Sequence, residues 1–345
     1  MDFTPTEEQE AARDLAARIF GDLATHERLA AAGTGSDAEL WKALCAAGLP
    51  GAVEEIGMLG LVLLLEEQGR TTAQVPLAAS GVYGILAVAR HGTEEQCARL
   101  LPGLRDGTTV VTGALPATGG VVADEGRLGG TVDWVPWLRD ATHVLVPDAE
   151  RGLWLVRTED AARVETVELT APWSAGRLVL DGTPAERIGR PDDPGPYEEV
   201  LAAARTAFAG LQAGVCAGSL ARAVAYTSVR EQFGRPLSTH QAVQLRAADA
   251  HMDTEAIRVT TYEAAWRYDE GLDAGGAALT AAWWASEAGK RVVHTGQHLH
   301  GGMGADLDHP VHRHFLWGRQ LDAYLGCGTE LLAELGDLLA NGDLS

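Results

Sequence analysis

The stretch VREQFGRPLSTHQAVQ, from Val229 to Gln244, separates two long alanine-rich runs and decides how the second half of the chain folds. Gly234 and Pro236 are residues that end helices, and Ser238 is of the type that caps the start of the next one. Arg230 is therefore predicted near the end of a long helix, at a corner from which its side chain projects.

Two interpretations of Arg230 follow from its place in this stretch. A cation there can neutralise the free carbonyl groups of the helix end. Alternatively, the planar guanidinium can bind a pair of phosphates, with Phe233 lying against an adenine or ribose and Gln241 bonding to ribose or phosphate oxygens. The residues alone leave both interpretations open.

Long helical patterns surround this corner, and they predict a C-terminal four-helix bundle. A last helix near Arg319 to Leu339 carries leucines at helical spacing. The three other principal helices are predicted at Tyr197–Phe233, Thr239–Tyr268 and Ala277–His298.

The first half of the chain reads as helices followed by strands. TPTEEQEAARDLAARIF predicts a helix with Thr4 as N-cap, Pro5 as its first residue and Glu7 completing a capping box. From about Thr108, short β-rich runs such as TTVVTGAL and THVLVPD alternate with Gly, Pro and Asp turns. The sequence thus predicts an α+β, mostly α chain with an N-terminal helical domain (1–107), a small, shortened antiparallel β-domain (108–190) and the bundle (191–345).

The charge balance limits the partners of the chain. It has 345 residues, 48 Asp plus Glu against 27 Lys plus Arg, and a formal charge of -21. Nucleic acids and anionic membranes require clustered cations, so neither is expected as a partner. The longest apolar run, Ile56–Leu65, is too short for a bilayer and the start resembles no secretion signal, which predicts a cytoplasmic protein without a membrane span.

The order helices, strands, four-helix bundle, together with R-x-x-F-G-x-P followed by H-Q, resembles the acyl-CoA dehydrogenase family. These flavoenzymes desaturate acyl-CoA thioesters between the α and β carbons. The resemblance covers nearly the whole chain, including the opening MDFTPTEEQE and HLHGGMGADLDHPVHRHF, which is similar to the family's Q-x-x-G-G-x-G segment. His298 stands where the family has Gln, and an imidazole can still make one hydrogen bond. The resemblance implies that the ADP half of an FAD, shared across a subunit interface, is held by Arg230, Phe233, Gln241, His298, Gly301 and Gly302.

The segments that would contact the flavin ring depart from the family pattern. Family members carry T-E-P-x-x-G-S-D and W-[IV]-[ST], whereas this chain has VTGALPATGG (Val111–Gly120) and DWVPW (Asp133–Trp137). Trp134 matches, but Pro136 replaces the hydroxyl residue and has neither a hydroxyl nor an N–H to offer. The resemblance therefore implies that this chain lacks some of the contacts by which family members hold the flavin ring.

The catalytic base of the family is also replaced. Removal of the α-proton requires a positioned carboxylate, which most members carry in a Y-E-G-T segment. An ungapped count from Gly301 puts Leu325 at that position, and Ala204 stands at the alternative position used by a minority of members. Asp322 and Glu330 lie nearby in sequence but are predicted on a solvated face of the last helix.

Five of the eleven histidines fall within seventeen positions, a density that can mark a metal site. Their spacings cross a Gly-Gly turn and a proline, and no HExxH pair is present, so no metal site is predicted. The five are His298, His300, His309, His312 and His314.

This chain keeps the motif residues for the adenosine side of FAD but lacks the catalytic base. In this it resembles the subunit without the catalytic glutamate in actinobacterial α2β2 acyl-CoA dehydrogenases that act on steroid side chains. The resemblance implies an inactive lone chain, a homologous partner that carries the glutamate, an acyl-CoA substrate of cholesterol catabolism and an acceptor like the electron-transfer flavoprotein. Two alternatives stay open: a self-sufficient flavoenzyme of altered chemistry, and a non-catalytic homologue that has lost FAD.

Overall fold

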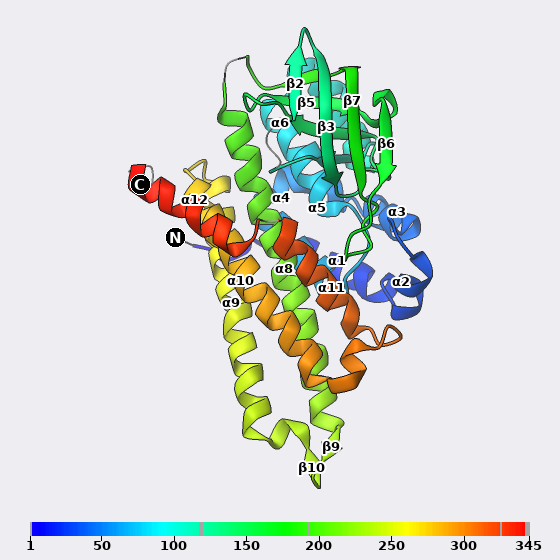
Figure 1. Ribbon diagram of the computed structural model, residues 1–345, viewed down its shortest axis with the longest axis vertical. Coiled ribbons are helices and arrows are strands. Elements are labelled where there is room, and N and C mark those ends of the chain that lie inside the picture. Colours follow the sequence, from blue (N-terminus) through cyan, green and yellow to red (C-terminus); the bar gives the residue numbers. More distant parts are fainter. Residues whose placement is uncertain (1, 117–119, 192, 325, 342–345) are drawn as a thin grey trace. The chain divides into compact units, whose positions relative to one another are not determined.

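The computed structural model describes residues 2–116, 120–191, 193–324 and 326–341. Its chain divides into two compact units (Figure 1). The sheet unit contains Pro5–Leu61 and Gln74–Ala204, and the helical unit contains Met1–Thr4, Val62–Ala73 and Arg205–Ser345. The three predicted domains divide the chain differently, and their boundaries at 107 and 190 stay a prediction.

Helix α1 of the sheet unit, Glu7–Leu23, begins two residues later than predicted. Its N-cap is Thr6, whose hydroxyl accepts from the backbone N of Gln9 while the Gln9 side chain accepts from Thr6 N. The predicted cap at Thr4 is wrong, because TPTE and TEEQ both fit the capping-box pattern and only the second forms. The other helices of this unit are α2 (His26–Ala32), α3 (Ala38–Ala46), the first part of α4 (Leu49–Thr71), α5 (Leu77–Ala79), the π-helix η1 (Ser80–Leu86), α6 (Ala87–His91) and α7 (Glu94–Asp106).

The expected small sheet domain is confirmed as two four-stranded sheets, with strand orders β1-β4-β5-β8 and β2-β3-β7-β6. Strand β1 pairs with β4 in parallel, and the other pairs in these two sheets are antiparallel. Leu128 and Leu178 of one sheet share an apolar core with Val144 and Val156 of the other. The strands are β1 (Val111–Gly113), β2 (Val121–Asp124), β3 (Arg127–Val135), β4 (His143–Pro147), β5 (Leu153–Arg157), β6 (Arg163–Thr166), β7 (Gly176–Pro184) and β8 (Glu186–Ile188), with the 3₁₀ turn η2 (Thr158–Asp160) between β5 and β6.

The C-terminal helical bundle is confirmed by α8 (Gly195–Val229), α9 (Gln241–Asp269), α10 (Gly275–Leu299) and α11 (Val311–Tyr324). The single last helix predicted over Arg319–Leu339 is wrong, because the chain forms α11 and then α12 (Gly328–Asn341). Gly326, at φ 88, lies between them in the left-handed region that commonly ends helices. Leu331 of α12 packs against Leu279 of α10.

Glycines allow α8 to cross the second part of α4 at very close range. Gly210, Gly214 and Gly218 are four residues apart on α8 and so share one face. A Cβ at Gly214 would lie 2.1 Å from the carbonyl oxygen of Glu66, and one at Gly69 would lie 2.3 Å from that of Leu211. No larger residue fits at these two positions unless the helices separate.

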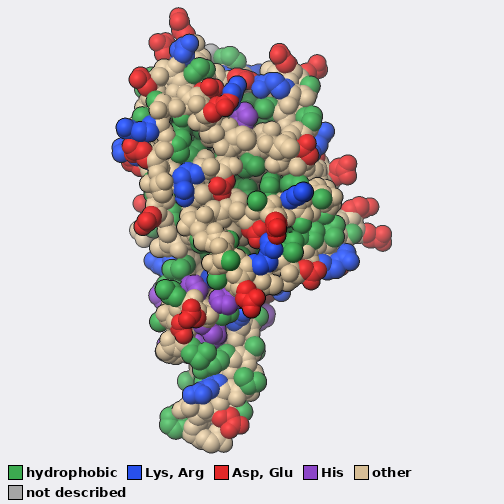
Figure 2. Space-filling model, turned by 90° about the vertical axis from the view of Figure 1, so that its right-hand side faces the viewer, with side chains coloured by type: hydrophobic (Ala, Val, Ile, Leu, Met, Phe, Trp, Pro, Cys, Tyr) green, Lys and Arg blue, Asp and Glu red, His purple; other side chains and the backbone are tan. Residues whose placement is uncertain are grey.

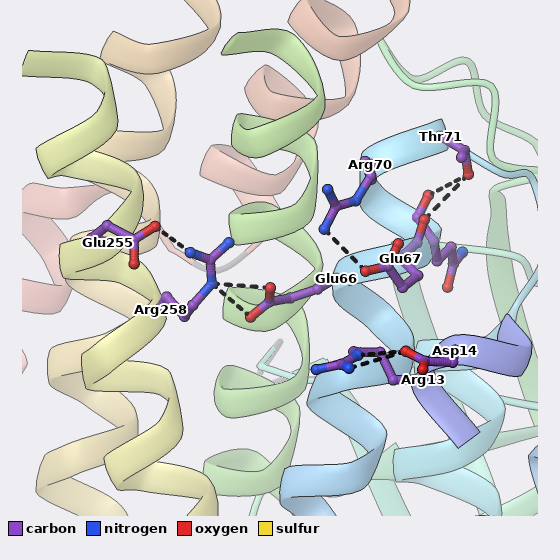
Figure 3. A network of polar contacts seen from close by, with 9 residues as sticks. Arg13, Asp14, Glu66, Glu67, Arg70, Thr71, Glu255 and Arg258 are labelled. Atoms are coloured by element: carbon purple, nitrogen blue, oxygen red, sulfur yellow. Dashed lines mark hydrogen bonds and ion pairs between the residues drawn. The ribbon is translucent and has the colours of Figure 1, made fainter. Parts of the chain in front are cut away.

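A buried ion pair fixes α9 to the same part of α4 (Figure 3). Nε of Arg258 lies 3.0 Å from Oε2 of Glu66, and the Glu66 side chain is only 7% exposed. Arg258 also pairs with Glu255 one turn earlier on α9. Loss of Arg258 would remove the ion-pair partner of the buried Glu66 carboxylate, so this contact holds α9 in one orientation.

Among the described residues, α8 is long and apolar enough to cross a membrane, and 89% of its most apolar 18-residue window is buried. Helices α3 and α4 qualify together only if they count as one span across a 75° bend.

Candidate functional site

A two-residue turn lies between α8 and α9, at the tip of a hairpin formed by β9 (Glu231–Gln232) and β10 (Arg235–Pro236) (Figure 1). Phe233 and Gly234 have φ values of 56° and 77°, as a type I′ turn requires. Helix α8 therefore ends at Val229, and its predicted end at Phe233 is wrong. The Phe233 side chain is 91% exposed in a conformation that costs energy for a bulky residue. Strain combined with exposure indicates a binding role rather than a packing role.

Arg230 lies where α8 gives way to this hairpin. Its backbone N donates to the carbonyl of Tyr226 at 2.9 Å, and its carbonyl accepts from Leu237 N at 2.9 Å. The residue is exposed, and its guanidinium makes no ion pair or hydrogen bond with any other described residue. Arg230 is thus rigid at its backbone and available at its side chain, which favours the phosphate-binding interpretation.

Helix α9 begins at Gln241, which is exposed. The predicted cap Ser238 is wrong: it lies in the 3₁₀ turn η3 (Leu237–Thr239), and His240 takes the N-cap position. The His240 ring lies edge-on to Phe233 at 6.1 Å. Gln241 therefore stands at a helix N-terminus, where backbone amides favour anions, beside the base of the hairpin.

The glycine loop follows α10 as the short 3₁₀ turn η4 (Gly301–Ala305). Gly301 has φ 62, and a Cβ built at Gly301 or Gly302 would meet no atom within 4 Å. The backbone of both residues is thus open to a ligand, and His298 before them is exposed. Gly304 differs, since a Cβ there would lie 2.3 Å from the carbonyl oxygen of Gln297.

An aromatic stack joins this loop to the end of α8. The His300 ring is stacked on Tyr226 with centroids 4.8 Å apart. His300 is only 3% exposed, and its Nδ1 lies 2.7 Å from the carbonyl oxygen of Gly296. Tyr226 precedes Arg230 by one turn, so the stack brings the Arg230 and Gly301 segments together. Sequence reasoning missed this role of Tyr226, for which an aromatic one turn before the arginine motif was the available signal.

Two histidines of the cluster, His300 and His314, are buried and make contacts within the chain. His300 and His309 have ring centroids 4.9 Å apart, and Figure 2 shows several histidine side chains gathered on one face. Burial lowers the pKa of His314 to about 4, and its Nε2 lies 3.0 Å from the carbonyl oxygen of Arg70. Over the described ranges, no three His, Cys, Asp or Glu residues are grouped to hold a metal ion.

The two flavin-type segments lie in the sheet unit. Ala117–Gly119 of the first segment fall outside the described residues. The hydroxyl of Thr112 donates to the carbonyl of Pro136 at 2.5 Å, so these two segments bond to each other. Trp137, at φ 59, is buried and stacked on Trp173 at 6.0 Å. Neither this hydroxyl nor Pro136 is left to donate to a flavin ring.

Of the two base positions, Ala204 is described and is buried at 5% exposure, whereas Leu325 falls outside the described residues. Asp322 was predicted on a solvated face, and this is wrong: it is 7% exposed and accepts from Ser286 Oγ at 2.5 Å. Glu330 is exposed, as predicted. The carboxylate of Glu334 on α12 is 2.6 Å from Arg205.

Comparisons with known proteins agree with these features. The acyl-CoA dehydrogenase N-terminal domain matches residues 6–108, and the acyl-CoA dehydrogenase C-terminal domain matches residues 197–333. Acyl-CoA dehydrogenase FadE27 of Mycobacterium tuberculosis is 35% identical over 99% of both chains.

Two solved structures are similar along nearly the whole chain. One, a variant of the Tcur3481-Tcur3483 steroid ACAD, is 43% identical with a TM-score of 0.92, covering 98% of this chain and 99% of that one. The other, the ChsE4-ChsE5 complex from Mycobacterium tuberculosis, is 33% identical with a TM-score of 0.91 and 99% coverage of both chains. This chain therefore belongs to the acyl-CoA dehydrogenase family.

Proposed function

We propose that this chain is the base-lacking subunit of a heteromeric, FAD-dependent acyl-CoA dehydrogenase. In this proposal a homologous partner in an α2β2 assembly supplies the catalytic glutamate and the flavin pocket. The observation that carries it is the contrast between an exposed, unpaired Arg230 at the cofactor motif and the alanine at the one described base position. Here the ADP half of FAD, shared across the subunit interface, contacts Arg230, Phe233, Gln241, His298, Gly301 and Gly302.

The residues of the helical unit fit the ADP half of FAD. The guanidinium of Arg230 has no partner among the described residues, and its fork of donors matches a pyrophosphate. The ring of Phe233 is 91% exposed and offers an adenine a face on which to stack. Gly301 and Gly302 leave room for close approach to their backbone. FAD bound there supplies hydride acceptance, which is the redox half of the desaturation.

The residues at the family's two base positions cannot remove the α-proton of the substrate. A carboxylate base must reach the α-proton of the thioester with a lone pair to spare. Asp322 already engages Ser286 and, at 3.0 Å, Arg319, and Glu334 engages Arg205. Ala204 has no proton-accepting group, and the sequence places Leu325 at the other base position. We therefore assign proton removal to the partner subunit.

The relatives support the proposed substrate. Since the solved structure at 43% identity is a steroid ACAD, the proposed substrate is a CoA thioester of a steroid side chain, as in cholesterol catabolism. An acceptor like the electron-transfer flavoprotein would reoxidise the flavin, and the enzyme would act in the cytoplasm.

The test is acyl-CoA dehydrogenation by the lone chain, by the partner chain and by the co-expressed pair. The partner chain to test is the one encoded by an adjacent open reading frame of the same family that keeps the glutamate. Activity should appear only in the pair, and Leu325→Glu in the lone chain should stay at background because no flavin contacts accompany the new carboxylate. Turnover by the lone wild-type chain would instead support a self-sufficient flavoenzyme, and an inactive pair without FAD would support a structural homologue.

A further inference from the structure

Three rings from separate segments of the helical unit lie against one another beside the glycine loop. Tyr226 belongs to α8, His300 is the C-cap of α10, and His309 lies between η4 and α11. The Tyr226 and His300 rings are stacked at 4.8 Å with 20° between their planes, and the His300 and His309 centroids are 4.9 Å apart. Rings at such separations attract each other and favour a fixed mutual orientation. These three rings are here called the ring stack.

One end of the ring stack supports the Arg230 segment. The two residues Tyr226 and Arg230 are four apart, and the Arg230 backbone N donates to the Tyr226 carbonyl at 2.9 Å. Both side chains therefore leave the helix on the same face. The Tyr226 hydroxyl makes no hydrogen bond with any other residue in the described part of the chain. The contact that Tyr226 provides is thus the face of its ring.

The middle ring of the stack fixes the start of the glycine loop. His300 directly precedes Gly301, is 3% exposed, and has its Nδ1 2.7 Å from the carbonyl oxygen of Gly296. At the end of the loop, Nε2 of Gln297 donates to the carbonyl of Gly304 at 3.1 Å. The backbone between these two contacts is therefore held at both ends while it stays open to a ligand.

The third ring of the stack is supported by α11. The Nδ1 atom of His309 accepts from the backbone N of Val311, the first residue of α11, at 3.3 Å. Helix α11 is bonded in turn to the end of α4, because Nε2 of His314 lies 3.0 Å from the carbonyl oxygen of Arg70. The ring stack thus connects the glycine loop to the long helices of the unit.

The end of α4 that supports α11 is itself strained. Thr72 has a φ of 54° and is 1% exposed, although a β-branched residue seldom adopts the left-handed region. Its hydroxyl donates to the carbonyl of Thr71 at 2.7 Å and accepts from Nε of Arg313 at 3.3 Å. Such strain persists only where the surrounding structure over-determines the conformation. The support behind the ring stack is therefore rigid.

We propose that Tyr226, His300 and His309 are positioning residues for the cofactor. Their rings hold the Arg230 segment and the Gly301–Gly302 backbone at the spacing at which both bind one pyrophosphate. This inference rests on the proposed function. Charge-assisted bonds from two segments to one anion are strongest when both segments are in place before the anion binds, because no ordering cost is then paid on binding. The three rings act through Arg230 and the glycine backbone rather than on the cofactor directly.

The experiment measures FAD and ADP binding by the complex with the base-carrying chain after FAD has been removed, using flavin fluorescence and titration calorimetry. ADP is the second probe because it is the half of FAD assigned to this chain. Tyr226→Leu removes the ring and should weaken FAD and ADP binding by the same factor, about tenfold or more. At saturating FAD, kcat should match the wild type, since proton removal is assigned to the partner.

Two further variants show whether the ring itself is responsible. Tyr226→Phe keeps the ring without the hydroxyl and should bind FAD and ADP like the wild type. Phe315→Leu is the matched control, since Phe315 of α11 also contacts a histidine of α10, His294, with centroids 4.8 Å apart. That pair lies away from the glycine loop, because His294 precedes His300 by six residues. Phe315→Leu should leave both affinities unchanged.

A double-mutant cycle tests whether the Tyr226 ring acts through Arg230. Tyr226→Leu combined with Arg230→Ala should weaken FAD binding by less than the product of the two single effects, because the position of a missing guanidinium no longer matters. Losses that multiply would show that the two residues contribute independently, which overturns the positioning role of Tyr226.

The outcomes separate this inference from the proposed function. If the wild-type complex binds neither FAD nor ADP, the proposed function is wrong and the inference falls with it. If the wild type binds FAD and Tyr226→Leu binds it equally well, the function stands and the positioning role is refuted. If Tyr226→Phe loses as much affinity as Tyr226→Leu, the hydroxyl contacts the cofactor directly. If Phe315→Leu loses as much, general loosening of the bundle is the cause, and each of these last two results also overturns the inference.

Discussion

At the scale of single residues, Arg230 carries the binding argument. It is anchored through its backbone between Tyr226 and Leu237 while its guanidinium has no partner among the described residues. A residue that only neutralised a helix end would need no such anchoring of the turn that follows.

Arg230→Ala should therefore weaken FAD binding by the complex by about tenfold to a hundredfold, the usual loss for one hydrogen-bonded charge. Flavin fluorescence during titration measures this. Arg18→Ala, an exposed arginine of α1 in the sheet unit, is the control and should leave FAD affinity unchanged. Equal affinity for the two variants would return Arg230 to the helix-end interpretation.

His314 predicts a pH dependence of stability. Burial lowers its pKa from 6.5 to about 4 in the folded chain, so the unfolded chain binds the proton first as pH falls. Neutral His314 contributes fully to the free energy of unfolding above about pH 6.5. This contribution is lost between pH 6.5 and 4, at a rate of at most about 1.4 kcal/mol per pH unit.

Denaturant unfolding of the wild type and His314→Gln, at several pH values, measures this contribution. The glutamine does not titrate and can still donate to the Arg70 carbonyl. The free energy of unfolding of the wild type should therefore fall relative to that of His314→Gln as the pH falls from 6.5 to 4. His298→Gln, at an exposed histidine, should follow the wild type. A difference that stays constant with pH would contradict the burial argument.

At the scale of elements, the glycines of α8 set how closely it crosses α4. Gly214→Ala should destabilise the chain by about 2 to 4 kcal/mol, because its Cβ would overlap the Glu66 carbonyl and force the helices apart. Gly336→Ala on α12 is the matched control, since a Cβ there meets nothing within 4 Å. It should be neutral or stabilising by up to about 1 kcal/mol, because alanine is the better helix former. Thermal unfolding separates these outcomes.

The elements also show how far sequence patterns reach. The long helices were predictable because their apolar faces repeat over many turns. The hairpin at Phe233 was not, since its two-residue strands carry no pattern and a phenylalanine is unusual in the left-handed region. The break between α11 and α12 depends on Gly326, which leucine spacing alone does not reveal.

At the scale of the whole molecule, residue identity was enough to propose candidate site residues but not to predict the contacts that support them. The family motifs suggested Arg230, Phe233, Gln241, Gly301 and Gly302 as site residues. An ungapped count placed Leu325 at the base position. The Tyr226–His300 stack and the burial of Asp322 arise from contacts between segments that are far apart in sequence. No local pattern predicts such contacts, which is why Asp322 was misplaced on a solvated face.

The most direct test of the account is the ratio of FAD to protein, from flavin absorbance and mass, for the purified lone chain and for the complex with the base-carrying chain. We predict no stoichiometric FAD in the lone chain and one FAD for each pair of unlike subunits in the complex. Stoichiometric FAD in the lone chain, at a mass that excludes a partner, would contradict the division of the active site between two chains.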